Sequence, residues 1–503
     1  MWIRLSGEGS LFRQVYGALR AEILARRLAP GTRLPATREL ARELGVSRNT
    51  VIQAYEQLLD EGYAAARTGS GTYVAEILPE DRVQVRGAKR AAAVGREGLR
   101  APARLERRPG RAPSLAARAQ RALDAVPRDL AWGMPRRRLP YDFRYGEPAF
   151  GDLPLETWWR LTARRGRRAS AAQLGNGAPG GAPELRSALA GYLQRARGVR
   201  CEPAQVIVVN GTQQAIDLVL RVLVDAGDRV ALEDPHYTGF SFALRAHGAE
   251  ILPVPVDEEG LVASVLEDAP PFRGVFVTPS HQFPTGGILP LARRLQLLAC
   301  AARRGAFVVE DDYDGEFRYD GRPIECLQGL DEDGRVLYVG STSKLLFPAL
   351  RIGWLVVPEP LARMFQQAKV LADTGTATLE QLVLADFILG GHLERHVRRS
   401  RARNAARREA LVAALDRHLG DEAALLGTGA GLHGVLSIPR LPMRREAELR
   451  KACAARGVGI YPIAPYYLTR PPPRAAFLLG FSALEENEIA EGIGRLAEAL
   501  AAL

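Results

Sequence analysis

The strongest constraint on the fold is a series of short apolar segments that alternate with longer helical segments through the middle of the chain. Each apolar segment is rich in Val, Leu or Phe and has the length of a buried strand. These segments cover residues 206–209, 230–233, 275–278, 307–310, 336–340 and 353–357. Such alternation predicts an α/β domain with a mostly parallel sheet covered by helices on both faces. After about residue 378 the pattern becomes mainly helical, with a smaller mixed region toward the end.

Polar motifs follow several of these segments, and open α/β sheets bind ligands at that edge. One motif, GSTSK at residues 340–344, ends in a lysine. Lysine is rare here, because only Lys89, Lys344, Lys369 and Lys451 occur among 68 basic residues. A lysine amine can lose its proton and attack a carbonyl, whereas an arginine stays protonated. The motif therefore predicts a Schiff base between Lys344 and an aldehyde cofactor that carries a phosphate.

Other polar residues supply the groups that pyridoxal phosphate requires. The motif NGTQQAID lies where a strand ends and a helix begins, which is a phosphate-binding position. Tyr237 is predicted to stack on the cofactor ring, Asp311 to hold its pyridine nitrogen, and Tyr313 to contact its phenolic oxygen. An arginine fork beside two serines completes the phosphate site. The predicted cofactor-binding residues are Gly211, Thr212, Gln213, Tyr237, Asp311, Tyr313, Ser341, Ser343, Lys344 and Arg351.

A second pattern, near the N-terminus, predicts a winged helix-turn-helix. Its segments are helices at residues 11–24, 37–44 and 48–60, and a two-stranded hairpin at 63–75. The third helix of such a domain enters the major groove of double-stranded DNA, and residues of its first turn reach base edges or phosphates. Ser47 is placed as its N-cap. The predicted contacts are Arg33 and Arg38 on the DNA backbone, and Ser47, Arg48, Asn49 and Thr50 in the groove.

The segment between the two patterns is strongly basic. Residues 82–138 contain 16 Lys or Arg and 4 Asp or Glu, and Arg, Ala, Pro and Gly dominate without a sustained period. We expect a linker, with a helix at about residues 115–126, and its charge permits nonspecific contact with phosphates. The predicted organisation is a DNA-binding domain at residues 1–76, a linker at 77–138, and a large ligand-binding and dimerisation domain at 139–503.

The composition also excludes several classes of protein. The first ten residues lack an apolar signal core, and no stretch approaches the roughly 18 apolar residues of a membrane span. The four cysteines show no CxxC pair and no histidine at ligand spacing. We therefore expect a cytoplasmic protein with reduced cysteines, no membrane contact and no metal site.

The N-terminal region resembles the GntR family of bacterial regulators through LPATREL, GVSR and GSGTYV, which end at residues 40, 48 and 74. The resemblance implies that Arg38 and Arg48 contact DNA and that Gly71, in the wing, approaches the minor groove. Residues from about 141 onward resemble fold-type I aminotransferases. The combination is similar to the MocR-type regulators, which implies that Lys344 binds pyridoxal phosphate as a sensor in a head-to-tail homodimer. The implied effector is pyridoxal phosphate itself, an amine or an amino acid.

Two positions depart from the aminotransferase pattern. Phe283 stands where these enzymes carry an asparagine that supports the phenolic oxygen, which leaves Tyr313 with His281 or Gln282 for that role. Leu478 stands where they carry an arginine for the substrate carboxylate, and Arg474 is the nearby candidate to replace it. We therefore expect a regulator rather than an efficient enzyme. Two alternatives remain open at this stage: an active aminotransferase with an accessory DNA-binding domain, and a repressor whose large domain is only a dimerisation scaffold.

Overall fold

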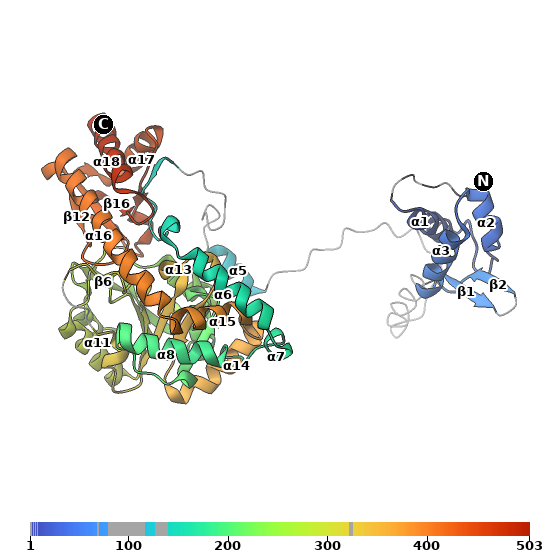
Figure 1. Cartoon of the computed structure of the whole chain (residues 1–503), viewed down its shortest axis with the longest axis horizontal. Coiled ribbons are helices and arrows are strands. Elements are labelled where there is room, and N and C mark those ends of the chain that lie inside the picture. The colour runs from blue at the N-terminus through green and yellow to red at the C-terminus, as the bar shows by residue number, and fades with distance from the viewer. Residues whose placement is uncertain are drawn as a thin grey trace, which may run out of the picture. The chain divides into compact units, whose positions relative to one another are not determined.

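The structure is a computed structural model that describes residues 9–67, 70–78, 116–125, 139–320 and 325–503, together with residues 3, 5 and 7. Contacts between residues divide the chain into two units, Met1–Ala112 and Pro113–Leu503. Both units are drawn in Figure 1.

The first unit contains three helices and a hairpin. Their bounds are α1 Leu11–Leu24, α2 Thr37–Leu44, α3 Arg48–Asp60, β1 Ala64–Arg67 and β2 Gly71–Val74. The three predicted helices are confirmed with their predicted limits, and the hairpin is confirmed within its predicted span.

Local chemistry explains where the helices of the first unit begin and end. Gly45 ends α2 in the left-handed region, with φ 66°, where glycine carries no steric penalty. Ser47 begins α3, because its Oγ accepts a hydrogen bond from the Thr50 amide at 3.1 Å. Apolar residues recurring along α1 and α3, including Val15, Leu19 and Val51, are completely buried between the helices.

The second unit is built around an eight-stranded sheet with the strand order β4-β11-β10-β9-β8-β5-β6-β7. Its neighbours from β10 through β6 are parallel, whereas β11 is antiparallel to both of its neighbours and β7 is antiparallel to β6. All six predicted strands are present, so the mostly parallel α/β sheet is confirmed. The strands are β4 Val206–Val209, β5 Arg229–Asp234, β6 Glu250–Asp257, β7 Gly260–Leu261, β8 Gly274–Val277, β9 Phe307–Asp311, β10 Val336–Ser341 and β11 Gly353–Val356.

Helices cover this sheet on both faces, and separate apolar clusters form where they pack on it. Strands β4, β8 and β9 are buried at every position, as expected for strands between two helical layers. The helices of this part are α6 Leu155–Arg168, α7 Ala171–Leu174, α8 Pro183–Arg197, α9 Thr212–Leu223, α10 Thr238–His247, α11 Leu291–Arg304, α12 Leu327–Leu330, α13 Thr342–Leu345, α14 Ala362–Asp373 and α15 Thr378–Leu389.

The C-terminal part forms a smaller region with its own core. Helix α16 (His392–His418) leads into a four-stranded sheet of order β12-β13-β16-β15, and α17 and α18 gather with β12 and β16 at one end of the second unit (Figure 1). The short strands β3 and β14 pair in parallel and join the start of this unit to the C-terminal region. The remaining bounds are β3 Tyr141–Asp142, β12 Ala424–Leu426, β13 His433–Pro442, α17 Glu446–Ala455, β14 Val458–Gly459, β15 Tyr461–Pro462, β16 Arg474–Gly480 and α18 Glu486–Ala501.

Most of the predicted linker, residues 77–138, lies outside the described residues. The helix expected within it is present as α5 (Ala117–Ala125), and this helix contacts α10 of the second unit. Part of the linker therefore belongs to the large unit rather than to a tether. None of the helices in the described ranges combines the length and the apolarity that crossing a bilayer requires.

Candidate cofactor-binding site and nucleic-acid interface

A cavity of about 310 Å³ opens where the parallel strands of the large sheet end. All but one of the predicted cofactor-binding residues line it, although they come from the ends of four different strands and the loops after them; the exception, Gly211, begins α9 beside Arg351. Parallel strands carry their following loops at a common edge, so the topology brings these residues together. The lining residues from the sequence prediction are Thr212, Gln213, Tyr237, Asp311, Tyr313, Ser341, Ser343, Lys344 and Arg351.

One end of the cavity has the character of a phosphate site. Helix α9 begins at Thr212, and its N-terminal amides and partial positive charge favour an anion. Arg351 donates a hydrogen bond to the Asn210 carbonyl and lies against Gly211, where an added Cβ would approach the guanidinium to 2.9 Å. Gly211 has φ 101°, which only glycine adopts readily. Ser341 and Ser343 border the same end and are linked by an amide-to-hydroxyl hydrogen bond of 3.2 Å.

A partly buried hydrogen-bond network supports the loop after β4 at this end. The Asp373 carboxylate accepts hydrogen bonds from Asn210 at 2.8 Å, Gln214 at 2.7 Å and Lys369 at 2.5 Å. The Lys369 side chain is fully buried and is held by this carboxylate and Thr376. Lys369 therefore fixes the loop after β4 and is not a second candidate for the cofactor aldehyde. No sequence motif marks Lys369, so its supporting role could not be predicted from the sequence.

Asp311 fits a protonated pyridine nitrogen. Its carboxylate is buried at the end of β9, and Oδ1 has no hydrogen-bond partner. Burial, Asp312 and Asp314 raise the pKa of Asp311 well above its usual range. A pyridinium nitrogen would supply both the missing donor and the missing positive charge. The residues present therefore fit pyridoxal phosphate at this end of the cavity.

Tyr237 and Tyr313 border the space that a cofactor ring would occupy. The Tyr237 ring is braced edge-on by Phe240 and Phe283, at centroid distances of 5.5 and 6.0 Å. The Tyr313 hydroxyl lies 2.9 Å from His281 Nδ1. Of the two residues expected to assist Tyr313, His281 has this contact, whereas Gln282 directs its amide to Glu233 and two backbone carbonyls.

Lys344 reaches the cavity from the short helix α13. Burial lowers the pKa of its amine, and the nearby carboxylates of Asp314 and Asp311 oppose that shift. The lowered pKa favours the neutral amine that reacts with an aldehyde. The amine donates a hydrogen bond to the Gly146 carbonyl. Gly146 has φ 76°, a conformation that favours glycine, and a Cβ there would lie 2.8 Å from the flexible end of Lys344.

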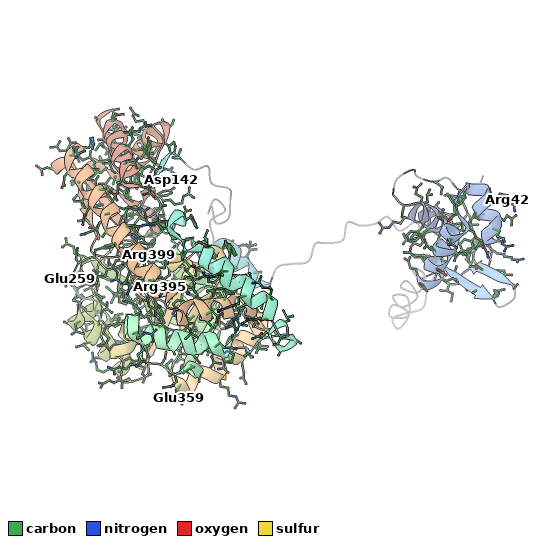
Figure 2. All side chains as sticks on the ribbon, viewed as in Figure 1. Arg42, Asp142, Glu259, Glu359, Arg395 and Arg399 are labelled. Atoms are coloured by element: carbon green, nitrogen blue, oxygen red, sulfur yellow. The ribbon has the colours of Figure 1, made fainter. Side chains whose placement is uncertain are left out.

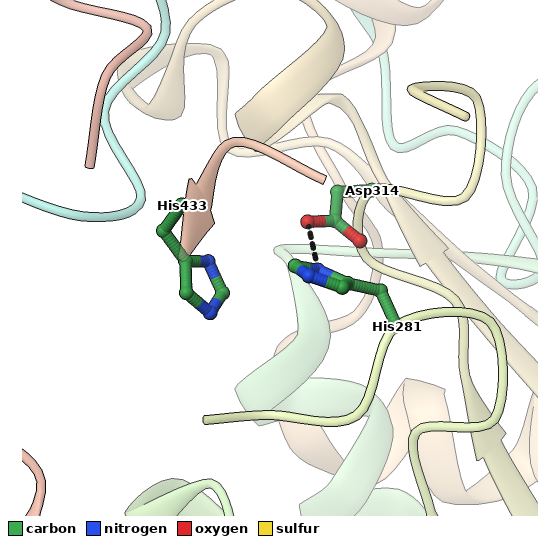
Figure 3. Close-up of side chains that lie close together, drawn as sticks. All are labelled: His281, Asp314 and His433. Atoms are coloured by element: carbon green, nitrogen blue, oxygen red, sulfur yellow. Dashed lines mark hydrogen bonds and ion pairs between the residues drawn. The ribbon is translucent and has the colours of Figure 1, made fainter. Parts of the chain in front are cut away.

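Three buried residues, His281, Asp314 and His433, lie close together beside the cavity (Figure 3). His281 Nδ1 lies 3.0 Å from Asp314 Oδ2, and His281 Nε2 lies 3.2 Å from the Gly427 carbonyl. Burial alone would lower the pKa of His281, but Asp314 outweighs it and raises that pKa. Burial and His281 lower the pKa of His433 well below its usual range. Since both nitrogens of His281 face oxygen acceptors, the group favours a hydrogen-bonded ion pair over metal coordination.

Several cavity residues were missed by the sequence prediction. Tyr145 and Gly146 come from the start of the large unit, and Leu432, His433 and Tyr466 come from its C-terminal region. The β3–β14 pairing carries the two segments to the same place across more than 300 residues of sequence. No motif marks them. The local sequence YGEP, at residues 145–148, is a possible signal for Tyr145 and Gly146, but it is too short to define a site.

The departure at Leu478 and its expected replacement by Arg474 have different outcomes. Leu478 is completely buried in β16, where it packs with Phe283 and Tyr466, two residues that line the cavity. The prediction that Arg474 replaces the missing arginine is wrong. Arg474 begins β16 as an exposed residue and does not line the cavity. Residues four positions apart lie on the same face of a strand, but at about 3.3 Å per residue Arg474 is about 13 Å from Leu478 along β16, too far to replace it.

Glu233 provides a pH-dependent test of the wall behind the site. Its buried carboxylate accepts hydrogen bonds from the Thr278 amide and hydroxyl and from Gln282. Burial raises its pKa to about 7, and these hydrogen bonds oppose the shift. The folded protein thus holds this proton more tightly than the unfolded chain, whose carboxyl has a pKa of about 4.3. The associated stability is present below about pH 4 and is lost as the pH rises through about 7.

Replacing Glu233 with glutamine removes that titration. We expect the unfolding free energy of Glu233→Gln, relative to the unmodified protein, to rise by up to about 2.5 kcal/mol between pH 5 and pH 8. Urea unfolding of both proteins at the two pH values measures this difference. A difference that stays constant with pH would show that Glu233 does not bind a proton in this range.

The first unit presents its predicted DNA-contacting residues at the surface. Arg33, Arg38, Arg48 and Asn49 are exposed, and Thr50 is half-buried. Within the described residues, none of the three arginines pairs with a carboxylate. Ser47 caps α3, so its hydroxyl is engaged with Thr50 at the start of the helix.

The wing is held close to Arg33. Arg33 forms an isolated bridge with Tyr73, and the Leu34 amide donates to the Thr72 carbonyl at 2.8 Å. Gly71 has φ 112°, and a Cβ there would approach Arg33 Nε to 3.2 Å. Figure 2 shows the side chains of this unit, with Arg42 on the neighbouring helix α2. The arrangement places the Arg33 guanidinium beside the wing.

Two family models match the two units. "Bacterial regulatory proteins, gntR family" matches residues 11–74, and "Aminotransferase class I and II" matches residues 142–496. A winged helix-turn-helix and an aminotransferase-type domain in one chain define a class of DNA-binding regulators with an enzyme-like second domain.

Known proteins narrow this class. The chain is 42% identical over 497 residues to the probable rhizopine catabolism regulatory protein MocR of Rhizobium meliloti, covering 98% of this chain and 94% of that protein. It is 30% identical to the pyridoxine biosynthesis transcriptional regulator PdxR of Corynebacterium glutamicum, covering 88% and 85%. A Thermus thermophilus α-aminoadipate aminotransferase, LysN, matches with a TM-score of 0.66 and 29% identity over 77% of this chain and 95% of the enzyme. The chain belongs to the MocR-type subgroup of GntR-family transcriptional regulators.

Proposed function

We propose that this protein is a pyridoxal phosphate-dependent transcriptional regulator of the bacterial cytoplasm. Its winged head binds operator DNA, and its large domain holds the cofactor on Lys344 and senses a small effector. The observation that carries the proposal is a buried lysine amine that shares a cavity with an orphaned carboxylate, Asp311, in a chain aligned with MocR over 98% of its length. The LysN structure was determined with a phosphopyridoxyl-leucine compound, which supports the choice of cofactor.

Each residue of the cavity has an assigned task in this proposal. Pyridoxal phosphate, when bound, would supply an aldehyde that reacts with a primary amine. Lys344 provides that amine, and Asp311 keeps the pyridine nitrogen protonated. Tyr237 stacks on the ring, and Tyr313, backed by His281, contacts the phenolic oxygen. The phosphate is bound by Gly211, Thr212, Gln213, Ser341, Ser343 and Arg351.

We further propose that the chain acts as a homodimer organised into residues 1–76, 77–138 and 139–503. The family matches at 11–74 and 142–496 support these limits, and within the middle segment α5 packs on α10 of the large domain. Exposed apolar side chains on α6, α14 and α15 support a subunit interface: Trp159, Leu371 and Leu389 are 57%, 84% and 71% exposed. Occupation of the cavity would favour one arrangement of the large domains, and the paired heads would then fit or miss the spacing of two half-sites.

An active aminotransferase is the less favoured alternative. The chain aligns with regulators over nearly its whole length, and Leu478 offers no charge to an amino-acid carboxylate. We expect at most a single half-reaction and no sustained turnover of an amino acid with an oxoacid. A scaffold without cofactor is disfavoured by the retained Lys344 and Asp311.

Binding of the holoprotein to DNA from its own promoter region tests the proposal. We expect log K to fall with log salt concentration, at about −0.9 per phosphate contacted. Arg38→Ala should make the slope less negative by about 0.9 for each head engaged, because one phosphate contact is lost. Fluorescence anisotropy at several salt concentrations measures both slopes. A flat response of the unmodified protein would exclude electrostatic DNA binding by the head.

A further inference from the structure

One ring nitrogen of His281 lies within hydrogen-bond distance of two neighbours. His281 Nδ1 is 3.0 Å from Asp314 Oδ2 and 2.9 Å from the Tyr313 hydroxyl (Figure 3 shows the contact with Asp314). The other ring nitrogen, Nε2, is 3.2 Å from the Gly427 carbonyl. A carbonyl only accepts hydrogen bonds, so Nε2 carries a hydrogen whether the ring is neutral or charged. The charge of the ring therefore decides whether Nδ1 donates or accepts.

The two charge states of His281 direct the Tyr313 hydroxyl differently. In a neutral ring, the Nδ1 lone pair accepts the Tyr313 proton, and the same lone pair faces the Asp314 carboxylate, which is also an acceptor. In a charged ring, Nδ1 donates its hydrogen to Asp314. Tyr313 then keeps its own proton for a group in the cavity, which its side chain borders.

The surroundings favour the charged ring. Asp314 is 1% exposed, and within the described residues its Oδ1 has no hydrogen-bond partner, so His281 is the donor that this buried carboxylate requires. Although burial opposes the shift, Asp314 raises the pKa of His281. The neighbouring His433 ring, 4.7 Å away between centroids, directs Nε2 to the Pro284 carbonyl. Burial and His281 lower the pKa of His433, so that ring stays neutral and does not compete for Asp314.

The residue at position 283 explains why the Tyr313 proton matters. Phe283 replaces the asparagine of the aminotransferase pattern, and its ring packs nearly perpendicular to Tyr313, at 6.2 Å between centroids. A phenyl ring cannot donate a hydrogen bond to an oxygen. The neighbouring Gln282 directs its amide to Glu233 and to backbone carbonyls. Tyr313 is therefore left as the donor for the cofactor's phenolic oxygen.

We infer that Asp314 and His281 form a positioning pair: the carboxylate holds the ring in its donating form, and the Tyr313 proton is thereby directed to the phenolic oxygen. This inference rests on the proposed function. A donor at that oxygen is worth most after the linkage between Lys344 and the cofactor has lost its proton, because the oxygen then has no proton to share with the neighbouring nitrogen. The pair therefore lowers the pH at which the linkage loses its proton. Asp311 and Lys344, which line the same cavity, are retained in every variant used to test this.

The Asp314→Leu variant tests the inference through the pH titration of the visible absorption of the cofactor-loaded protein. Leucine has a similar size but holds no charge on His281, so the neutral ring accepts the Tyr313 proton. The midpoint should rise by about one pH unit, a change of about tenfold in proton affinity, which is the effect of losing one hydrogen bond to a charged oxygen. The charge of Asp314 acts in the opposite direction, since this carboxylate opposes the lowering of the Lys344 pKa by burial. A midpoint that falls or stays unchanged would overturn the inference.

Tyr313→Phe distinguishes an effect that passes through the tyrosine from one that acts on the linkage directly. Alone, it should raise the midpoint by about the same amount as Asp314→Leu. Combined with Asp314→Leu, it should give no further rise, because the proton to be directed is already absent. Additive shifts in the double variant would contradict a positioning role. Asp320→Leu, at an exposed ion pair with Arg408, is the matched control and should leave the midpoint unchanged.

A second measurement keeps the inference testable if Asp314→Leu does not fold. Nitrogen-15 NMR of the cofactor-loaded protein with labelled histidine reports whether His281 carries both ring hydrogens, and the loss of a signal in His281→Asn assigns it. Both hydrogens are expected at neutral pH, and a singly protonated ring would overturn the inference. These failures leave the protein coloured and the proposed function intact, whereas a protein that stays colourless in added pyridoxal phosphate would overturn both.

Discussion

The Lys344→Ala protein is expected to lose the visible absorption of bound pyridoxal phosphate after free cofactor is removed by gel filtration. Lys344 is buried in the cavity, and the other cation that lines it, Arg351, cannot react with the aldehyde. Cofactor affinity should fall on the order of 100-fold or more, about 2.7 kcal/mol, because only noncovalent contacts remain. Absorption spectroscopy and equilibrium dialysis measure the two effects.

Lys451→Ala is the matched control for this experiment. Lys451 is an exposed lysine on α17, and its replacement should leave absorption and cofactor affinity unchanged. The Lys344→Ala protein should also unfold as cooperatively as the unmodified protein in the absence of cofactor. Retention of the visible absorption by Lys344→Ala would assign the aldehyde to a different amine.

Replacement of Arg48 by alanine is expected to weaken operator binding and to flatten the preference for operator over unrelated DNA. Arg48 begins α3 and is exposed, and among the described residues its side chain has a single long contact of 3.4 Å, with the Thr37 hydroxyl. A guanidinium in the first turn of a recognition helix reads a base with two hydrogen bonds, worth about 1 to 3 kcal/mol. Operator affinity should therefore fall about 5-fold to 150-fold. Footprinting and anisotropy with both DNAs measure it.

Arg13→Ala is the control within the same unit. Arg13 is exposed on α1, next to Phe12, which borders the surface formed by the C-terminal half of α3. Its loss should change binding to operator and unrelated DNA by the same small factor. Cofactor absorption should be unaffected in both variants. If Arg48→Ala and Arg13→Ala weakened operator binding equally, Arg48 would have no part in sequence recognition.

The head and the large sheet could be predicted in detail because their signals are local. Ser47 and Gly45 mark the limits of two helices through capping chemistry, and the periodic apolar residues mark the rest. The residues after the strands could be grouped as well, since parallel strands place their following loops at one edge. That rule brought Thr212, Tyr237, Asp311 and Lys344 to one cavity without knowledge of any contact.

The aromatic side of the cavity, with Tyr145 and Tyr466, could not be predicted, because it depends on pairing between distant segments. Tyr145 and Tyr466 are 321 positions apart, and their hydroxyls are in contact. Nothing in either local sequence indicates the partner. The unpaired Asp314 oxygen is a property of the folded cavity alone. The expectation for Arg474 fails for the opposite reason: Arg474 is close to Leu478 in sequence but lies at the exposed end of β16.

The central claim is that the chemistry at Lys344 controls DNA binding by the head. Its most direct test is the operator affinity of the full chain with and without pyridoxal phosphate, measured in parallel for the unmodified protein and Lys344→Ala. The account predicts that the cofactor changes the affinity of the unmodified protein at least about fivefold, the lower range of coupling between sites, and leaves that of Lys344→Ala unchanged. An equal change in both proteins, or no change in the unmodified protein, would contradict it.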